Sequence, residues 1–499
     1  MRHKVLDIFR TFSEYDIKAF SKFLNSPFFN ESEKLIRLFN ILISFYPSFN
    51  SNLLTDKKIS ENLSPNLAYN KSTIKVLFSN LYNCSLNYLM VKNLMYKPFE
   101  SQDLLRNELF SRNLYRYVEE NIIRFESSGK INENIDVSYF LNMFQLYTDK
   151  SNLIYLKNSK KNKELIDQDI DALIKRGVYL TYFFVMEFMR EFDNLTSIGA
   201  TYEFSKQQNL IYKLFNALNF ESLFDLLIQN ANNKKYSIVL KIYLSLYLTF
   251  SNFDTETFYY EYKKLVLNNL NLLSIDEKRF HISRMLKYCM LKRDSSAFSV
   301  KFDNELFYVY DFLLKKGYYK STVTEFFPDE LFRNILKLGL KLKKYNWVLN
   351  FIKNYVKRLI PDRRKNMQNF SLAEYYFSRK MFKDSLKYLH KVVIDDFIFK
   401  LDIKNMMLIT YFELREYDAA LSLIDSYNHF LSGDRTLSSN QRIRYKNFVN
   451  ATQKLILLKT SAGKHPTIDL ELRLKNDFPY KQWVNEKFNV IIDGLSKAV

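Results

Sequence analysis

Apolar side chains recur every three or four positions along most of this chain, the spacing of one face of an α-helix. Leu35, Leu38, Phe39 and Leu42 follow this pattern until Pro47 ends it. A second pattern runs from about residue 72 to 98. The first hundred residues are therefore predicted to form a compact helical unit.

A turn is expected between two helices of this unit, at residues 26–30, because a residue that precedes proline disfavours the α conformation. Phe28 and Phe29 lie in this turn and are expected to be buried in the core, as phenylalanine usually is. Asn30 is expected to cap the next helix, with Glu33 reaching back to it.

The repeat in the last third of the chain is more specific. Residues 345–349, 382–386 and 417–421 are three versions of one motif, Tyr or Phe followed by small and apolar residues, at intervals of 37 and 35. A period near 34 is typical of helix–turn–helix repeats that bury their apolar faces by stacking. Ser385 and Ala420 are expected where the two helices of a unit approach most closely.

Within the second unit, Ser371 is expected to cap the first helix, with Glu374 three residues on. Residues 370–427 resemble the tetratricopeptide-repeat superfamily, although Asn369 and Lys404 stand where the repeat favours Trp and Phe397 where it favours Pro. The resemblance implies a binding scaffold with no chemistry of its own, whose concave face holds peptides or helices.

Composition supports the same fold class. The chain has 499 residues but 8 Gly and 8 Pro, several-fold fewer than average usage of about 7% and 5%. Sandwiches, barrels and propellers need many tight turns made by these residues. The sequence therefore excludes them and predicts helix for more than roughly two thirds of the chain, against a base rate of about one third.

The predicted fold is all-α, a helical-hairpin solenoid with an N-terminal helical unit. Its parts are expected at 1–100 (N-terminal unit), 101–320 (hairpins without a fixed register), 321–460 (tetratricopeptide-like repeats) and 461–499 (a tail with a terminal helix). The chain also resembles, more loosely, long helical proteins of Bacteroidetes-type bacteria, and no activity comes with that likeness.

The charge is strongly positive and unevenly distributed. The net charge is +20 and the pI is about 9.4. Residues 337–365 hold ten cations against one acid, and residues 435–464 hold seven cations and no acid. Such blocks suggest nucleic acid or acidic proteins as partners, although A+T-rich coding bias explains the excess equally well. The candidate partner-binding residues are Lys343, Lys344, Arg363, Arg364, Lys365, Arg442, Arg444 and Lys446.

Two functions remain open at this point. The leading hypothesis is a non-enzymatic scaffold that binds an unidentified protein or peptide. The alternative is a nucleic-acid-binding protein that uses blocks 337–365 and 435–464, with Tyr345, Trp347, Tyr355 and Tyr445 as stacking surfaces. Buried aromatic rings would favour the scaffold. Residues 363–365 follow Pro361 and are expected to be exposed in a loop between repeats.

A weaker indication of nucleic-acid binding lies near the N-terminus. Residues 54–63 and 72–81 resemble the helix-turn-helix of bacterial response regulators, whose recognition helix begins with a similar Ser/Thr-Ile-Lys run. The connection between them is longer than that motif allows and contains Pro65. Few basic residues are available on the expected recognition helix for phosphate contacts.

No catalytic, cofactor-binding or metal-ligating residue is predicted. No two glycines are closer than 22 positions, so neither glycine-rich nucleotide motif can be formed. The five histidines include no pair at i, i+4, and Cys84 and Cys289 are far apart. The most apolar window, residues 236–250, is too short to span a membrane. A cytoplasmic protein without a membrane span is therefore expected.

Overall fold

The computed structural model describes residues 3–496 except 50–53, 64–69, 128–133, 158–162, 200–208, 295–298, 321–325, 394–396, 434–436, 438 and 461–476. These residues form α-helices with two short 3-10 helices and no strand, and the helical content of 83% confirms the all-α prediction. Contacts divide the chain into two compact units, Met1–Ser237 and Ile238–Val499. The four-part division stays a prediction.

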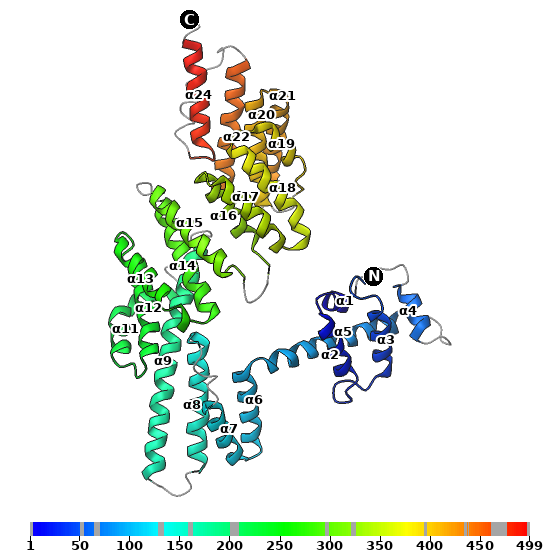
Figure 1. Cartoon of the computed structure of the whole chain (residues 1–499), viewed down its shortest axis with the longest axis vertical. Coiled ribbons are helices and arrows are strands. Elements are labelled where there is room, and N and C mark those ends of the chain that lie inside the picture. The colour runs from blue at the N-terminus through cyan, green and yellow to red at the C-terminus, as the bar shows by residue number, and fades with distance from the viewer. Residues whose placement is uncertain are drawn as a thin grey trace. The chain divides into compact units, whose positions relative to one another are not determined.

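The first unit begins with a body of five helices, shown in blue in Figure 1. They are α1 (Lys4–Phe9), α2 (Glu14–Leu24), α3 (Glu33–Ile43), α4 (Asp56–Leu63) and α5 (Lys71–Met95). The apolar pattern predicted around Leu38 is fully buried in their common core, together with Phe9 and Phe20. Helix α5 packs against α1, α2, α3 and α4, so it is the central helix of this body.

The turn at residues 26–30 lies between α2 and α3 as predicted, but its side chains differ from expectation. Phe28 is 87% exposed, and Phe29 is partly exposed with its ring stacked on Phe23. The prediction that both rings fill the core was therefore wrong. Asn30 does not cap α3: its side chain donates to the Leu24 carbonyl and accepts from the backbone of Ser32.

The rest of the first unit consists of helical pairs. These helices are α6 (Pro98–Ser111), α7 (Tyr115–Ser127), α8 (Val137–Lys157), α9 (Lys163–Gly199), α10 (Leu210–Ala217) and α11 (Phe220–Gln229). Helices α8 and α9 pack along most of their length. A buried ion pair joins α6 to α8, where Arg106 Nε lies 2.5 Å from an oxygen of Asp149 and both side chains are almost fully buried.

The second unit starts within α12 (Lys234–Ser251). It continues with α13 (Glu256–Asn268), η1 (Leu270–Leu272), α14 (Ile275–Asp294), α15 (Ser299–Lys316), α16 (Asp329–Lys341), α17 (Tyr345–Tyr355), η2 (Val356–Arg358), α18 (Pro361–Ser378), α19 (Phe382–Leu389), α20 (Phe397–Leu414), α21 (Tyr417–Gly433), α22 (Ser439–Thr460) and α24 (Lys481–Ser496). In Figure 1, the helices from α16 onward form a stack of pairs.

Three hairpins carry the repeated motif. Each motif begins a helix, at Tyr345, Phe382 and Tyr417, and each of these second helices packs on the helix before it. We call α16, α18 and α20 the first helices and α17, α19 and α21 the second helices. The first helices also contact one another, α16 with α18 and α18 with α20.

The position three residues into each second helix is buried in all three hairpins. Val348, Ser385 and Ala420 occupy this position and are fully buried, as predicted for the last two. Ser385 donates its hydroxyl to the carbonyl of Ala373 across the hairpin, at 2.9 Å. The larger Val348 faces Gly339, where an added Cβ would lie 2.8 Å from a valine methyl carbon.

The turn inside each hairpin has one geometry. Lys343, Lys380 and Arg415 have φ of 55°, 60° and 64°, and the amide of the next residue donates to a carbonyl of the preceding helix. This is the common left-handed termination of helices, normally made by Gly or Asn. A side chain in this conformation costs about 1–2 kcal/mol, and a cation at a helix C-terminus returns about 0.3–1 kcal/mol.

The start of α18 corrects two predictions. Helix α18 begins at Pro361, the N1 position that proline favours, so Arg363, Arg364 and Lys365 are helical and not in a loop. Ser371 lies in the middle of α18, fully buried, and its hydroxyl donates to the Met367 carbonyl. It is therefore not a capping residue.

Candidate functional site

The first helices of the hairpins carry a set of ionised side chains that meet one another. Lys337 of α16 lies 2.9 Å from a carboxylate oxygen of Asp402 on α20 and 3.5 Å from Glu374 on α18, measured from Nζ. Arg333, one turn before Lys337, lies 3.4 Å from the other oxygen of Asp402. We call these four residues the charged seam. It connects three successive first helices.

Burial and charge act against each other in the seam. Burial lowers the pKa of Lys337, but the carboxylates of Glu374 and Asp402 outweigh it and raise that pKa above its ordinary value. Burial raises the pKa of Glu374, and Lys337 only partly offsets this. A buried carboxylate held this way requires its cation. Lys337 is thus committed to the seam and is not available to an outside anion.

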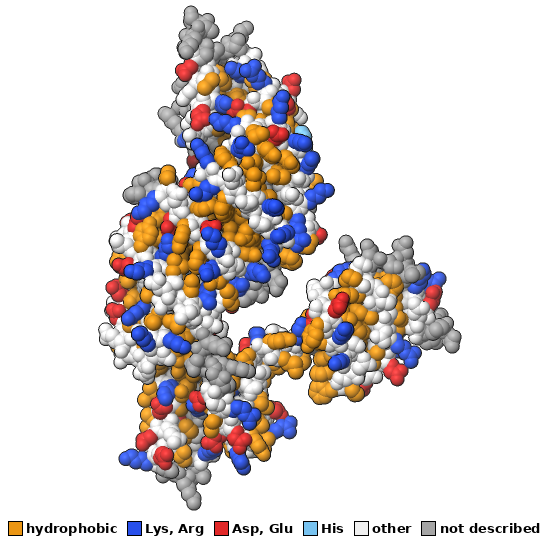
Figure 2. Space-filling model, viewed as in Figure 1, with side chains coloured by type: hydrophobic (Ala, Val, Ile, Leu, Met, Phe, Trp, Pro, Cys, Tyr) orange, Lys and Arg blue, Asp and Glu red, His pale blue; other side chains and the backbone are white. Residues whose placement is uncertain are grey.

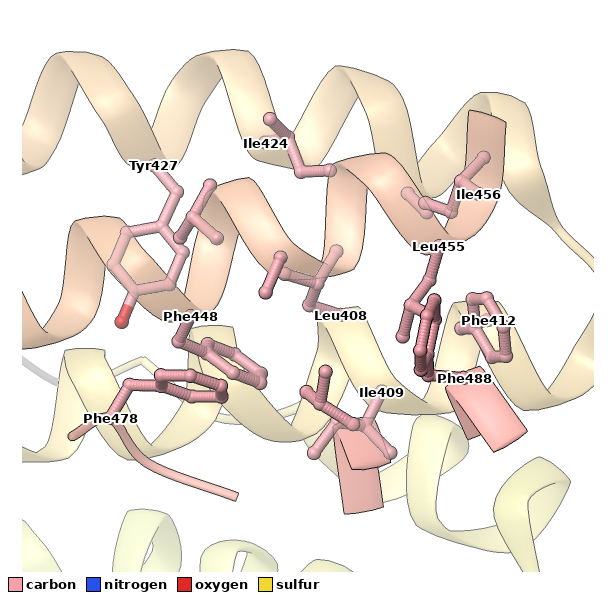
Figure 3. Packing of buried hydrophobic residues seen from close by; sticks show 14 of the residues in the cluster. Leu408, Ile409, Phe412, Ile424, Tyr427, Phe448, Leu455, Ile456, Phe478 and Phe488 are labelled. Atoms are coloured by element: carbon pink, nitrogen blue, oxygen red, sulfur yellow. The ribbon is translucent and has the colours of Figure 1, made fainter. Parts of the chain in front are cut away.

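Next to the seam, helix α24 packs onto the hairpin stack. Phe478, Val484, Phe488 and Ile491 are buried in one core with residues of α20, α21 and α22. Figure 3 shows Phe478 beside Phe448, and Phe488 close to Leu455. Residues 478–491 therefore supply part of the core of the hairpin stack. The sequence predicted a tail with a terminal helix at 461–499 and did not predict this packing.

Two polar contacts orient α24. The indole nitrogen of Trp483 donates to a carboxylate oxygen of Glu413, at 2.7 Å, and the Lys487 ammonium lies 2.8 Å from the same carboxylate. Trp483 also packs edge-on against Phe412, and Tyr480 against Phe377. Glu413 thus recognises an aromatic N–H and a cation one helical turn apart. We call Phe377, Phe412 and Glu413, together with the buried residues of α20, α21 and α22 in the core that α24 shares, the α24 seat.

The predicted site residues of the first block lie at two places. Lys343 and Lys344 are exposed in the α16–α17 turn, and Lys344 lies over the ring of Phe307, at 4.8 Å. Arg363, in the first turn of α18, is paired with Asp329 on α16. Arg364 donates to the carbonyl of Leu359, and Lys365 is exposed.

The predicted residues of the second block lie in α22. Arg444 is exposed and its Nε lies 2.9 Å from Asp477, while Arg442 and Lys446 are partly buried. Successive helices of the stack run antiparallel, so the starts of α18 and α22 share one edge and the α16–α17 turn lies at the other. The eight residues therefore do not form one patch. Arg435 and Lys464 of this block lie outside the described residues.

The aromatic residues proposed for stacking are packed against protein. Trp347 stacks on Phe351, and its indole nitrogen lies 3.4 Å from Asp311. Tyr355 packs against Phe327 as well as Phe351. Tyr345 and Tyr445 are likewise only partly exposed. Figure 2 shows Lys and Arg side chains spread over the visible surface of these helices.

Two other features of the described residues were considered as sites. A cavity of about 930 Å³ between α7, α8 and α9 is lined by several charged side chains, but Lys150 is paired with Glu126 and Lys175 with Asp171. Fully buried Glu277 and His281 bond to the hydroxyls of Tyr243 and Tyr262 in the interior. No group of possible metal ligands occurs within the described ranges.

Some of these residues could have been found from the sequence. Trp483 is one of two tryptophans, and Lys487 follows it by one helical turn, so the two side chains are expected on one face of a helix. The sequence Asn113-Leu114-Tyr115 is a further copy of the turn, with Asn113 at φ 59° between α6 and α7. Glu413 carries no sequence signal of its own.

Comparison with known proteins gave no assignment: no family model, no curated protein and no solved structure matches this chain. Among the described helices, none is long and apolar enough to cross a lipid bilayer.

Proposed function

We propose that the protein is a non-enzymatic interaction scaffold, built from tetratricopeptide-like hairpins, whose first-helix face binds a helical segment of a partner protein. The observation that carries the proposal is the α24 seat. Glu413 there holds the indole N–H of Trp483 and the ammonium of Lys487, above an apolar core that buries Val484 and Phe488. An amphipathic helix in an apolar groove is a common mode of peptide recognition.

The hairpin geometry supports the same reading. Three hairpins share a turn geometry, a buried contact position and contacts between successive first helices. These features support a tetratricopeptide-like solenoid, in which the first helices would line the binding face. The packing of Trp347 and Tyr355 against other rings also supports a scaffold over a surface that stacks nucleic-acid bases.

The partner segment follows from the contacts of α24. It needs apolar residues at i, i+4 and i+7, as Val484, Phe488 and Ile491 provide, and an aromatic donor and a lysine on the adjacent strip. Such a segment competes with α24 for Glu413.

A peptide-binding experiment tests this proposal. The variant Trp483→Ala/Lys487→Ala weakens the hold on the internal helix, and a labelled peptide of residues 477–496 is titrated against it. We expect binding to this variant at least tenfold tighter than to the parent, whose own α24 fills the seat. Adding Glu413→Gln should weaken binding by about tenfold, or 1.4 kcal/mol.

The matched control is the same peptide with Lys487→Glu. It should not bind, because the substitution places a second carboxylate beside that of Glu413. Circular dichroism shows whether each variant remains folded. Absence of peptide binding to a folded variant would refute the proposal. An affinity that Glu413→Gln leaves unchanged would refute it too. Affinity purification from the native host, with nuclease and salt controls, then identifies the partner and separates a protein from a nucleic acid.

A further inference from the structure

The three hairpin turns place a cation at the same point of each repeat. Lys343, Lys380 and Arg415 occupy the left-handed position that ends α16, α18 and α20. Since the first helices of stacked hairpins run in the same direction, their C-terminal ends share one edge of the array. We call this set of three residues the cationic row.

The residue types of the row are unusual for this conformation. Two other helices in the described part of the chain end in the same hydrogen-bonded turn, and there the chain uses the residues that tolerate it: Asn113 after α6 and Gly317 after α15. In the three hairpins, by contrast, the position is taken each time by Lys or Arg, which are strained there. An observed backbone outlier that recurs in one place is grounds for a functional hypothesis.

The side chains of the row are all exposed, and they also make no polar or ring contact with the described residues. Neighbouring cations differ in this respect: Lys341 is paired with Asp303, and Arg379 lies over the rings of Tyr345 and Tyr375. The row is thus free to meet an anion, as is the exposed Lys383 beside it.

The charge of the surrounding edge is positive at the first two turns. Lys344, Arg379 and Lys383 lie beside Lys343 and Lys380, with Asp384 as the nearest acid in those sequences. At the third turn, Glu416 and Asp418 flank Arg415 and balance it. The aromatic residues that begin the second helices are partly buried, so this edge offers charge contacts and no stacking surface.

We propose that the cationic row binds an extended acidic segment of a partner protein, with carboxylates at every third residue. Adjacent first helices are in contact, which sets their axes about 8–10 Å apart. An extended chain in the polyproline II conformation advances about 3.1 Å per residue with three residues per turn, so residues i, i+3 and i+6 lie on one face and match successive turns. The row shares no residue with the α24 seat, and this inference does not depend on the proposed function.

The turn geometry allows a variant that removes the charges without harming the fold. In Lys343→Gly/Lys380→Gly/Arg415→Gly, each new glycine adopts the left-handed conformation without strain. The variant should therefore melt at the same temperature as the parent or higher. The matched control is Lys353→Ala/Lys357→Ala/Arg358→Ala, which removes three exposed cations around the connection from α17 to α18, at the opposite edge.

The probe is a labelled peptide with three glutamates, each separated by Gly-Ser, and its partner probe carries glutamine instead. By fluorescence anisotropy at low salt, we expect the parent and the control variant to bind the acidic peptide, and the glycine variant to bind it at least tenfold more weakly. The glutamine peptide should not bind, and added salt should weaken the acidic one.

Several results would overturn the inference. One is failure of the parent to bind the acidic peptide, and another is equal binding by the glycine variant. An equal loss in the control variant would show that net charge, and not this edge, attracts the peptide. Tighter binding of a single-stranded RNA of similar charge, lost in the glycine variant, would assign the row to nucleic acid instead.

Discussion

The contact between Gly339 and Val348 permits a quantitative test of the hairpin packing. In Gly339→Ala, the new Cβ would lie 2.8 Å from a methyl carbon of Val348, whereas carbons pack at about 3.5–4.0 Å. Overpacking of this kind costs about 1–3 kcal/mol, and replacing a helical glycine returns about 1 kcal/mol. We expect a net destabilisation of about 0–2 kcal/mol.

A second substitution, Val348→Ala, removes the methyl group that the added Cβ would meet. Val348→Ala alone deletes two buried methyl groups, which costs about 2 kcal/mol. In the double variant, the new methyl group at 339 enters the space that the valine leaves. The double variant should therefore be more stable than the sum of the single effects predicts, by about 1–2 kcal/mol.

The assay uses the fluorescence of Trp347, whose ring atoms lie 3.4 Å from the added Cβ. A Trp483→Phe background removes the second tryptophan, so that urea unfolding is followed at this hairpin. Gly177→Ala is the matched control, because nothing lies within 4 Å of its Cβ; it should stabilise the chain by about 1 kcal/mol. Effects of the two substitutions that add to within about 0.5 kcal/mol would refute the close contact.

Three further outcomes are expected. Ala420→Leu should overpack the third hairpin and cost about 1–3 kcal/mol in urea unfolding, while the same change at the less buried Ala419 should cost less. Lys92, Ser13 and Tyr88 outweigh the opposing effect of burial and hold the pKa of Asp16 at about 2, below its ordinary 3.8. The Asp16 charge therefore stabilises the fold above about pH 4, and Asp16→Asn should cost about 1–2 kcal/mol at pH 7; the difference should vanish as the pH falls from about 4 to 2, and a constant difference would contradict this. Asp149→Leu should cost about 3 kcal/mol because it leaves the buried Arg106 with only Asp103, at 3.4 Å, as its counter-ion, and adding Arg106→Met should recover most of that loss; circular dichroism during denaturation measures both.

Local sequence signals predicted the helices well, and the turn chemistry less well. The motif at 345, 382 and 417 marks three helix starts, and the rings of Phe382 and Tyr417 pack against Phe377 and Phe412 of the preceding helices. Pro361 was interpreted as part of a loop, although proline favours both turns and the first position of a helix. The residues that follow Pro361 did not distinguish a turn from the first position of a helix. Ser371 failed as a cap for the same reason, since α18 had already begun ten residues earlier.

The candidate site was less predictable, because it depends on contacts far apart in the chain. Asp402 and Lys337 are 65 positions apart, and Glu413 and Trp483 are 70 apart. The basic block at 337–365 was visible as composition, but its pairing with Asp329, Glu374 and Asp402 was not. Charge density along a sequence counts cations, whereas the fold decides which of them are neutralised.

The participation of α24 in the core has a consequence for synthesis. Translation proceeds from the N-terminus, and domains generally fold as they emerge. Phe448, Leu455 and Ile456 can be made long before Phe478 and Phe488, which complete their shared core. Until residues 478–491 have left the ribosome, the last hairpin presents an unfinished apolar surface to the cell. A premature stop codon in this stretch would therefore yield an aggregation-prone product, because it removes the side chains that complete this core.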